Sequence, residues 1–249
     1  MTTMIPPSHP RYQSLIIRER LVTGMKKGLV HETGLIAHGR GEAFDYLLGE
    51  CTIPPAEQAI QAAAMALKQA HHPVISVNGN VAALVPDECI LLSTLIPAPL
   101  EVNLFHRTNE RMERILHEFE SHGAKDVLGW IGDAQIPGLD HDRARCDSKG
   151  IYSADVVLVP LEDGDRCQAL VDMGKTVIAI DLNPLSRTAR TASITIVDNV
   201  IRALPLLISS LQKIQKQDTE NDTILKQWNN TKMLEDVLSY MAKKLNGPL

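Results

Sequence analysis

Arg40 stands between two glycines in the segment Gly39-Arg40-Gly41, and its setting is the first to suggest ligand binding. Glycines let a backbone come close to a ligand, and an arginine offers a fork of donors that suits phosphate or carboxylate. A glycine-rich turn with a surface arginine would produce the same sequence. We predict a turn in which Arg40 contacts an anion.

A second candidate is Asp181-Leu182-Asn183, which directly follows the apolar run 176–180. An acidic residue at the end of a core strand commonly binds the hydroxyl pair of a ribose, and Arg187 could then contact a phosphate. Asp and Asn are also frequent turn formers, so these residues could simply build the turn that Pro184 ends. The residues alone leave both interpretations open.

Further polar side chains occur where predicted strands end. Asn78-Gly79-Asn80 follows an apolar run, and N–H groups at the helix start behind it could bind an anion, unless Asn80 only caps that helix. Histidines in such places can transfer protons or contact phosphate, although a single histidine is often structural. By location, the candidate substrate-binding residues are His38, Asn78, Asn80, Asn103, His106 and Arg107.

Several common signatures are absent from the sequence. No Gly-x-Gly-x-x-Gly follows a strand, and there is no P-loop, no Gly-x-Ser-x-Gly elbow and no clustered set of metal ligands. The residues therefore indicate an α/β protein that handles phosphate groups and has no metal site built from its own side chains.

The elements that must position these residues alternate between short β-branched runs and helical stretches. We predict strands near residues 74–77, 101–105, 126–130, 155–159, 176–180 and 194–197, with a long loop at 132–150. We predict helices near residues 10–27, 56–70, 81–84, 89–95, 108–122, 164–173, 198–215 and 223–244, with Asp198 capping the penultimate one. This alternation is typical of a Rossmann-like, doubly wound α/β fold, in which helices cover both faces of a mainly parallel sheet.

Length and composition fit one domain of 249 residues, with N-terminal helices at about 1–72, a sheet core at about 73–215 and a tail helix at about 218–245 that could serve dimerisation. The net charge of −5 argues against a general attraction to nucleic acid or anionic membranes. No apolar run reaches the roughly 20 residues of a membrane span, and the spacing of the four cysteines fits free thiols. We expect a cytoplasmic protein.

Longer motifs carry a family resemblance. Residues 5–12, 34–50, 77–80, 101–105, 150–166 and 180–188 resemble, in this order, the archaeal-type 4-phosphopantoate–β-alanine ligases, or phosphopantothenate synthetases. The resemblance covers about residues 5–210 and does not extend to the tail beyond 217. It implies a homodimeric, Rossmann-like enzyme of coenzyme A biosynthesis that condenses (R)-4-phosphopantoate with β-alanine and converts ATP to AMP and diphosphate, through an acyl-adenylate.

The resemblance also implies roles for particular residues. Arg40 and Arg187 would offset charge in the transition state, and a Mg2+ ion would accompany ATP. Asp181 would hold the ribose. Carried over position by position, the ATP contacts would be Arg18, Arg40, Asp181, Leu182, Asn183, Arg187, Thr188, Asn199 and Val200.

Two other functions compete with this one. An NAD(P)-dependent oxidoreductase would also use a parallel sheet and an acidic residue such as Asp181, although the glycine-rich phosphate turn is missing. A nucleotide-sensing module without catalysis would bind ATP and leave it intact. An assay for AMP in the presence of all three substrates separates these possibilities.

Overall fold

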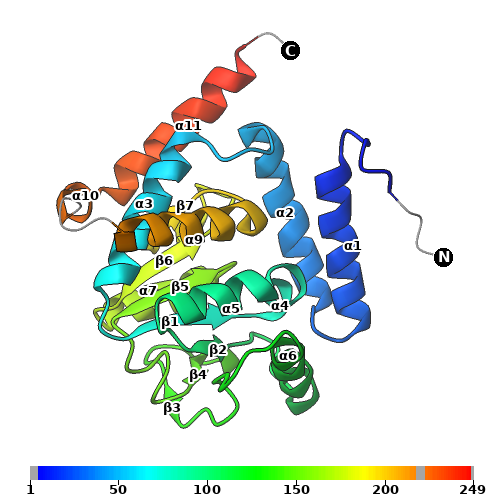
Figure 1. The fold of residues 1–249 in the computed structure, drawn as a ribbon, viewed down its shortest axis with the longest axis vertical. Coiled ribbons are helices and arrows are strands. Elements are labelled where there is room, and N and C mark those ends of the chain that lie inside the picture. Colours follow the sequence, from blue (N-terminus) through cyan, green and yellow to red (C-terminus); the bar gives the residue numbers. More distant parts are fainter. Residues whose placement is uncertain (1–4, 217–221, 248–249) are drawn as a thin grey trace.

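A computed structural model describes residues 5–216 and 222–247 and shows an α/β fold around a five-stranded parallel sheet (Figure 1). The strands are short and almost wholly buried, as expected for β-branched runs covered on both sides. They lie in the order β2-β1-β5-β6-β7. Their bounds are β1 Pro73–Val77, β2 Leu100–Val102, β5 Val156–Pro160, β6 Thr176–Ile180 and β7 Ile194–Ile196.

Helices cover both faces of this sheet, so the predicted doubly wound fold is confirmed. Alternate residues of a strand point to opposite faces, and Leu158 and Val157 accordingly belong to two separate hydrophobic clusters. The larger cluster lies under α3 (Pro54–Gln69), α5 (Pro86–Leu95) and α9 (Val200–Lys216). The smaller one lies under α7 (Gly164–Asp172) and the segment 134–154.

The first two helices stand at the end of the sheet to which the strands point (Figure 1). They are α1 (Tyr12–Lys26) and α2 (Glu32–Leu48). Asn80, just after β1, donates from Nδ2 to the carbonyl of Gly34 in α2 at 3.0 Å. A methyl group on Gly41 would lie 3.5 Å from Leu182, just after β6. Helix α2 therefore crosses the carboxyl ends of the strands.

The strand order reverses between β1 and β5. From β1 the chain passes to β2 on one side, whereas β5 is followed by β6 and β7 on the other side. Asn78 bridges this junction, because its Nδ2 donates to the carbonyls of Pro160 at 3.1 Å and Leu161 at 3.2 Å. Such a topological switch point is where open parallel sheets bind ligands.

The predicted turn at Gly39-Arg40-Gly41 is wrong, because these residues lie in the middle of α2. The predicted strand at 126–130 is also wrong. Asp126 and Gly129 have φ angles of 53° and 108°, which break an extended strand, and one isolated bridge joins Leu128 to Glu101. The predicted loop at 132–150 contains a two-stranded hairpin, β3 Ala134–Gln135 and β4 Arg145–Cys146, and a short 3-10 helix, Asp142–Ala144.

Helix starts differ slightly from the prediction. Asn78, and not Asn80, caps α4 (Gly79–Leu84) by accepting from the N–H groups of residues 80 and 81. Helix α9 begins at Val200, so Asn199 takes the cap position that was predicted for Asp198. Thr108 caps α6 (Asn109–Ser121).

The predicted tail helix consists of two helices, α10 (Asp222–Gln227) and α11 (Asn230–Leu245). The helix is interrupted at Trp228, whose Nε1 donates to the carbonyl of Ser193 at 3.0 Å. Asn229 then caps the second helix. The sequence also predicts a charged break at 217–222, of which residues 217–221 lie outside the described residues and Asp222 begins α10. Within those residues, no helix combines the length and the apolar character that crossing a membrane requires.

Candidate active site

A cavity of about 320 Å³ lies at the switch point, and we call it the switch-point cavity. The ends of three strands and one face of α2 supply its walls. The lining residues used below are His31 and Arg40 from α2 and its cap, Asn78 and Asn80 after β1, His106 after β2, Arg111 in α6, Arg143, and Asp163 after β5. Among the predicted substrate-binding residues, the fold therefore brings together Asn78, Asn80 and His106.

Positive charge dominates this cavity, because Arg40, Arg111 and Arg143 line it together with one carboxylate, Asp163. Arg111 donates to two backbone carbonyls, from Nε to Leu29 at 3.0 Å and from Nη1 to His106 at 2.9 Å. Burial and the nearby Arg143 lower the pKa of Arg111 to about 10, so the group remains charged at neutral pH. The cavity is built to receive an anion.

A buried ion cluster forms the floor. Glu162 pairs with both Arg143 and Arg166, and Arg166 also donates to Ser76 on β1 at 3.0 Å. Arg143 Nε and Asp163 Oδ2 face each other at 3.1 Å, but the angles do not make a hydrogen bond, and both atoms are buried without a hydrogen-bond partner. The floor of the cavity therefore contains one donor, Arg143 Nε, and one acceptor, Asp163 Oδ2, that form no hydrogen bond.

Two imidazole rings stack beside the arginines. The ring centres of His31 and His106 lie 3.9 Å apart. Nδ1 of His31 accepts from the N–H of Thr33 and so caps α2. Burial, then His106 and Arg111, lower the pKa of His31, so its ring is neutral at pH 7 and can donate from Nε2.

A second cavity, of about 600 Å³, lies between α1, α2 and the start of α9, and we call it the α1–α2 cavity. Three of its charged lining residues, Glu42, Asp45 and Arg202, form ion pairs. Glu42 accepts from Arg18 at 2.8 Å, and Arg202 pairs with Asp45 and Asp198. The predicted residues that line it are His38, whose pKa burial lowers, and Asn199. His38 is thus not in the switch-point cavity.

The segment after β6 forms a turn, which is one of the two interpretations that its sequence left open. Asp181 accepts from the N–H of Asn183 at 2.9 Å and from the hydroxyl of Ser186. Burial raises the pKa of Asp181, while these two hydrogen bonds and the nearby Arg40 oppose the rise. Arg40 is therefore close enough to act on both the cavity and this turn. A ribose contact by Asp181 stays a prediction.

The remaining predicted ATP contacts are engaged within the protein. Arg187 is exposed, pairs with Asp165 and is not among the residues lining the switch-point cavity. Thr188 is buried and donates to the carbonyl of Glu162 at 2.9 Å. Asn199 donates to Asp45 at 3.1 Å. The side chains of Leu182 and Val200 are also buried, which leaves backbone groups there for ligand contacts.

Two predicted substrate-binding residues hold loops in place. Asn103 donates from Nδ2 to the carbonyls of Arg143 at 3.3 Å and Arg145 at 2.9 Å, and thereby positions Arg143. Arg107 donates to the carbonyl of Gly129 at 2.6 Å. Neither of the two lines the switch-point cavity.

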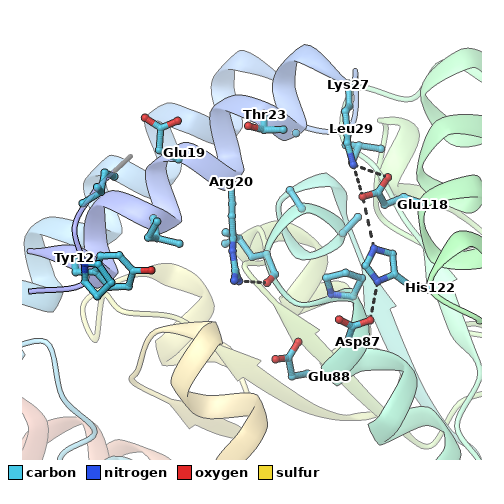
Figure 2. Close-up of a pocket in the computed structure, with 18 residues that line it drawn as sticks. Tyr12, Glu19, Arg20, Thr23, Lys27, Leu29, Asp87, Glu88, Glu118 and His122 are labelled. Atoms are coloured by element: carbon cyan, nitrogen blue, oxygen red, sulfur yellow. Dashed lines mark hydrogen bonds and ion pairs between the residues drawn. The ribbon is translucent and has the colours of Figure 1, made fainter. Parts of the chain in front are cut away.

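A third cavity, of about 740 Å³, lies between α1, the start of α5 and the end of α6 (Figure 2). Lys27 pairs with Glu118 at 2.8 Å, and His122 lies 2.7 Å from Asp87 (Figure 2). Arg20 points to the carbonyl of Leu84. None of the predicted site residues lines this cavity, so we do not place the active site there.

Comparison with known proteins identifies the family. The family model "Phosphopantothenate/pantothenate synthetase" matches residues 55–244. The chain belongs to this family. The sequence resemblance is thereby confirmed, and members of the synthetase family with known names resemble the chain along nearly its whole length.

Three relatives carry the name 4-phosphopantoate–β-alanine ligase. The protein of Thermococcus kodakarensis is 53% identical over 245 residues, which cover 97% of this chain and 93% of the relative. The protein of Methanosarcina mazei is 51% identical over 98% of this chain and 96% of its own length. The protein of Methanospirillum hungatei is 51% identical over 97% of this chain and 98% of its own length.

Four members of the site in this synthetase escaped prediction from single residues: His31, Arg111, Arg143 and Asp163. Arg143 and Arg111 lie in a predicted loop and a predicted amphipathic helix, where a surface arginine is the ordinary interpretation. The only sequence signal for Asp163 is its place just after the strand that ends at Pro160. Their common property is proximity to the switch point, which depends on the order of strands in the sheet.

Proposed function

We propose that this chain joins 4-phosphopantoate to β-alanine and forms 4'-phosphopantothenate, in the biosynthesis of coenzyme A. The names of relatives that share about half of its residues along nearly the whole chain support this function. The single structural observation that carries it is the switch-point cavity with three arginines and one carboxylate. Such a cavity suits a small acid that bears more than one negative charge.

ATP supplies the driving force in this proposal, because a carboxylate does not condense with an amine in water. A carboxylate oxygen of 4-phosphopantoate attacks the α-phosphorus of ATP, the bond to the β-phosphate breaks, and diphosphate leaves. The neutral amine of β-alanine then attacks the carbonyl carbon of the mixed anhydride. AMP leaves, the nitrogen loses a proton to solvent or a nearby base, and the amide remains.

Arg40 is placed to serve the first of these steps. It lines the switch-point cavity, and it also acts on Asp181 in the turn after β6, where the family resemblance predicts ATP. A cation between the two binding regions offsets the charge that builds up when a carboxylate approaches a phosphate. Arg187 has the same role in this proposal, after the phosphates of ATP replace Asp165 as its ionic partner.

A Mg2+ ion would accompany the triphosphate. Across 5–216 and 222–247, no three His, Cys, Asp or Glu side chains gather as a metal-binding group. ATP phosphates and water would therefore provide most of the ligands, as is usual for Mg2+ with nucleotides. The homodimer implied by the resemblance and the cytoplasmic location expected from the sequence belong to the same proposal.

The test is to incubate the purified protein with ATP, 4-phosphopantoate and β-alanine and to measure AMP, diphosphate and 4'-phosphopantothenate. We expect one AMP for each product molecule, and no product when any substrate is left out. Isotope exchange between diphosphate and ATP should require 4-phosphopantoate but not β-alanine. ATP that remains intact would favour a sensing module, and tight NADH binding without AMP formation would favour an oxidoreductase.

A further inference from the structure

Arg111 is a charged group that lines the switch-point cavity without a carboxylate partner among the described residues. Among the residues that the structure describes, no carboxylate lies within 4 Å of its guanidinium nitrogens. Nε and Nη1 hold the carbonyls of Leu29 and His106, and Nη2 points along Gly79. A methyl group on Gly79 would lie 2.7 Å from Nη2 and 2.0 Å from the Leu29 carbonyl oxygen. A side chain at position 79 would therefore clash with the guanidinium, and glycine avoids this clash.

Burying an uncompensated charge costs free energy, and the lowered pKa of Arg111 reflects that cost. A second observation indicates a missing ligand. Arg143, which is 6% exposed and lines the same cavity, has an Nε without a hydrogen-bond partner. Arg143 already faces Glu162 and Asp163, so an anion that enters the cavity would offset the cost at Arg111 above all.

We propose that Arg111 and the stacked pair His31–His106 bind the phosphate group of 4-phosphopantoate and make the enzyme select the phosphorylated acid over pantoate. This inference rests on the proposed function. The stacked rings lie beside Arg111 and each ring carries at least one N–H, so the three side chains can donate to one phosphate.

The position of Arg111 in the fold separates this phosphate from those of ATP. Arg111 follows β2, at one edge of the sheet, whereas the predicted ATP turn follows β6. Three strand intervals separate β2 from β6, which is about 14 Å at the usual strand spacing. A volume of about 320 Å³ also suits a small phospho-acid and is small for a whole nucleotide. The carboxylate end then points toward Arg40.

The first experiment uses inorganic phosphate as a probe and does not depend on catalysis. Phosphate binding to the intact protein is measured by calorimetry, for the wild type, Arg111→Met and the control Arg114→Met, an exposed arginine one turn further along α6. We expect binding in the wild type and the control and a loss of at least about 10-fold in Arg111→Met. A wild type that binds no phosphate, or equal binding in Arg111→Met, would overturn the assignment.

The second experiment measures steady-state kinetics with 4-phosphopantoate and with pantoate. In Arg111→Met, kcat/KM for 4-phosphopantoate should fall by about 30-fold or more, while kcat/KM for pantoate and KM for ATP change less than about twofold. Arg111→Lys should recover only part of the loss, because it keeps the charge and loses the fork. Equal losses for both acids would indicate a merely structural role and contradict the proposal.

His31→Asn keeps the proposal testable if Arg111 variants fail to fold, because Asn can cap α2 as His31 does. It should lower kcat/KM for 4-phosphopantoate by about 3- to 10-fold and leave pantoate unaffected. Unchanged selectivity in this folded variant would count against the histidine pair. If the wild type forms no AMP, the proposed function fails, whereas the phosphate titration still decides the role of Arg111.

Discussion

The two ends of the ligand-binding edge differ in how far their arginines are paired with carboxylates. At the end near α1 and α9, Arg18 pairs with Glu42, and Arg202 pairs with Asp45 and Asp198. At the switch point, Arg40 and Arg111 have no carboxylate within 4 Å among the described residues. Paired charges at the first end connect α2 to α1 and α9, and we propose that the unpaired charges at the switch point bind a ligand. The comparison therefore marks Arg40 and Arg111 as arginines whose charge is available to a ligand.

The largest effect should come from breaking the paired end with Arg202→Met. The substitution leaves Asp45 and Asp198 buried without their cation, and such a loss costs about 3–5 kcal/mol of unfolding free energy. Urea denaturation measures it, with Arg190→Met, an exposed arginine of α8 (Arg187–Thr191), as the control. A loss below about 1 kcal/mol would show that these pairs do not hold α2 to α9.

Glu101 in β2 is a buried carboxylate that forms no ion pair with an arginine among the described residues. It accepts hydrogen bonds from the backbone N–H groups of Asp147 and Ile151. Burial raises its pKa to about 7 from 4.5, against the effect of those hydrogen bonds. The neutral form is favoured on folding, so its stabilisation is complete below pH 4.5 and lost as pH rises to about 7. The wild type should lose up to about 3 kcal/mol over this window.

Glu101→Gln cannot ionise and serves as the reference for that measurement. Urea denaturation of both proteins at several pH values between 4.5 and 8 gives the difference in unfolding free energy. We expect this difference to change across the window and to level off above pH 7. Parallel curves would show that Glu101 has an ordinary pKa.

Arg40→Ala tests the unpaired end by activity. The variant should lose at least about 2 kcal/mol of transition-state stabilisation, or about 30-fold in kcat/KM. Its thermal unfolding should match the wild type, because the side chain is exposed and unpaired. Arg190→Ala provides the control. Wild-type turnover in Arg40→Ala would remove this arginine from the mechanism.

Gly39→Ala has the smallest expected effect and tests whether the residues beside Arg40 are helical and do not form the predicted turn. Gly39 lies inside α2, and nothing lies within 4 Å of an added methyl group. Alanine should therefore stabilise the protein by about 0.5–1 kcal/mol, measured by thermal unfolding. A destabilisation of that size would indicate that the segment needs the turn conformation after all.

The sheet was predictable because its strands are continuous β-branched runs between turn residues. The predicted strands at 155–159 and 176–180 match β5 and β6 within one residue. Helix α2 was not predictable from local preference, because Gly34, Gly39 and Gly41 all disfavour a helix. Its formation depends on packing of Leu35, Leu47 and Leu48 against the core.

The site was predictable only in part, for a related reason. Strand ends indicated Asn78, Asn80 and His106 as candidates for substrate binding, and the fold places these three residues in one cavity. Arg111 escaped notice because its significance comes from Leu29, 82 residues away, and from the missing carboxylate. A sequence does not show whether an arginine lacks a carboxylate partner in the folded protein.

The most direct test of the account is a crystal structure with 4-phosphopantoate and a non-hydrolysable ATP analogue. The account predicts the phosphate of the acid within hydrogen-bond distance of Arg111, about 3 Å, and its carboxylate beside Arg40 next to the α-phosphate. A phosphate of the acid bound instead in the α1–α2 cavity, near Arg202, would contradict the division between paired and unpaired arginines.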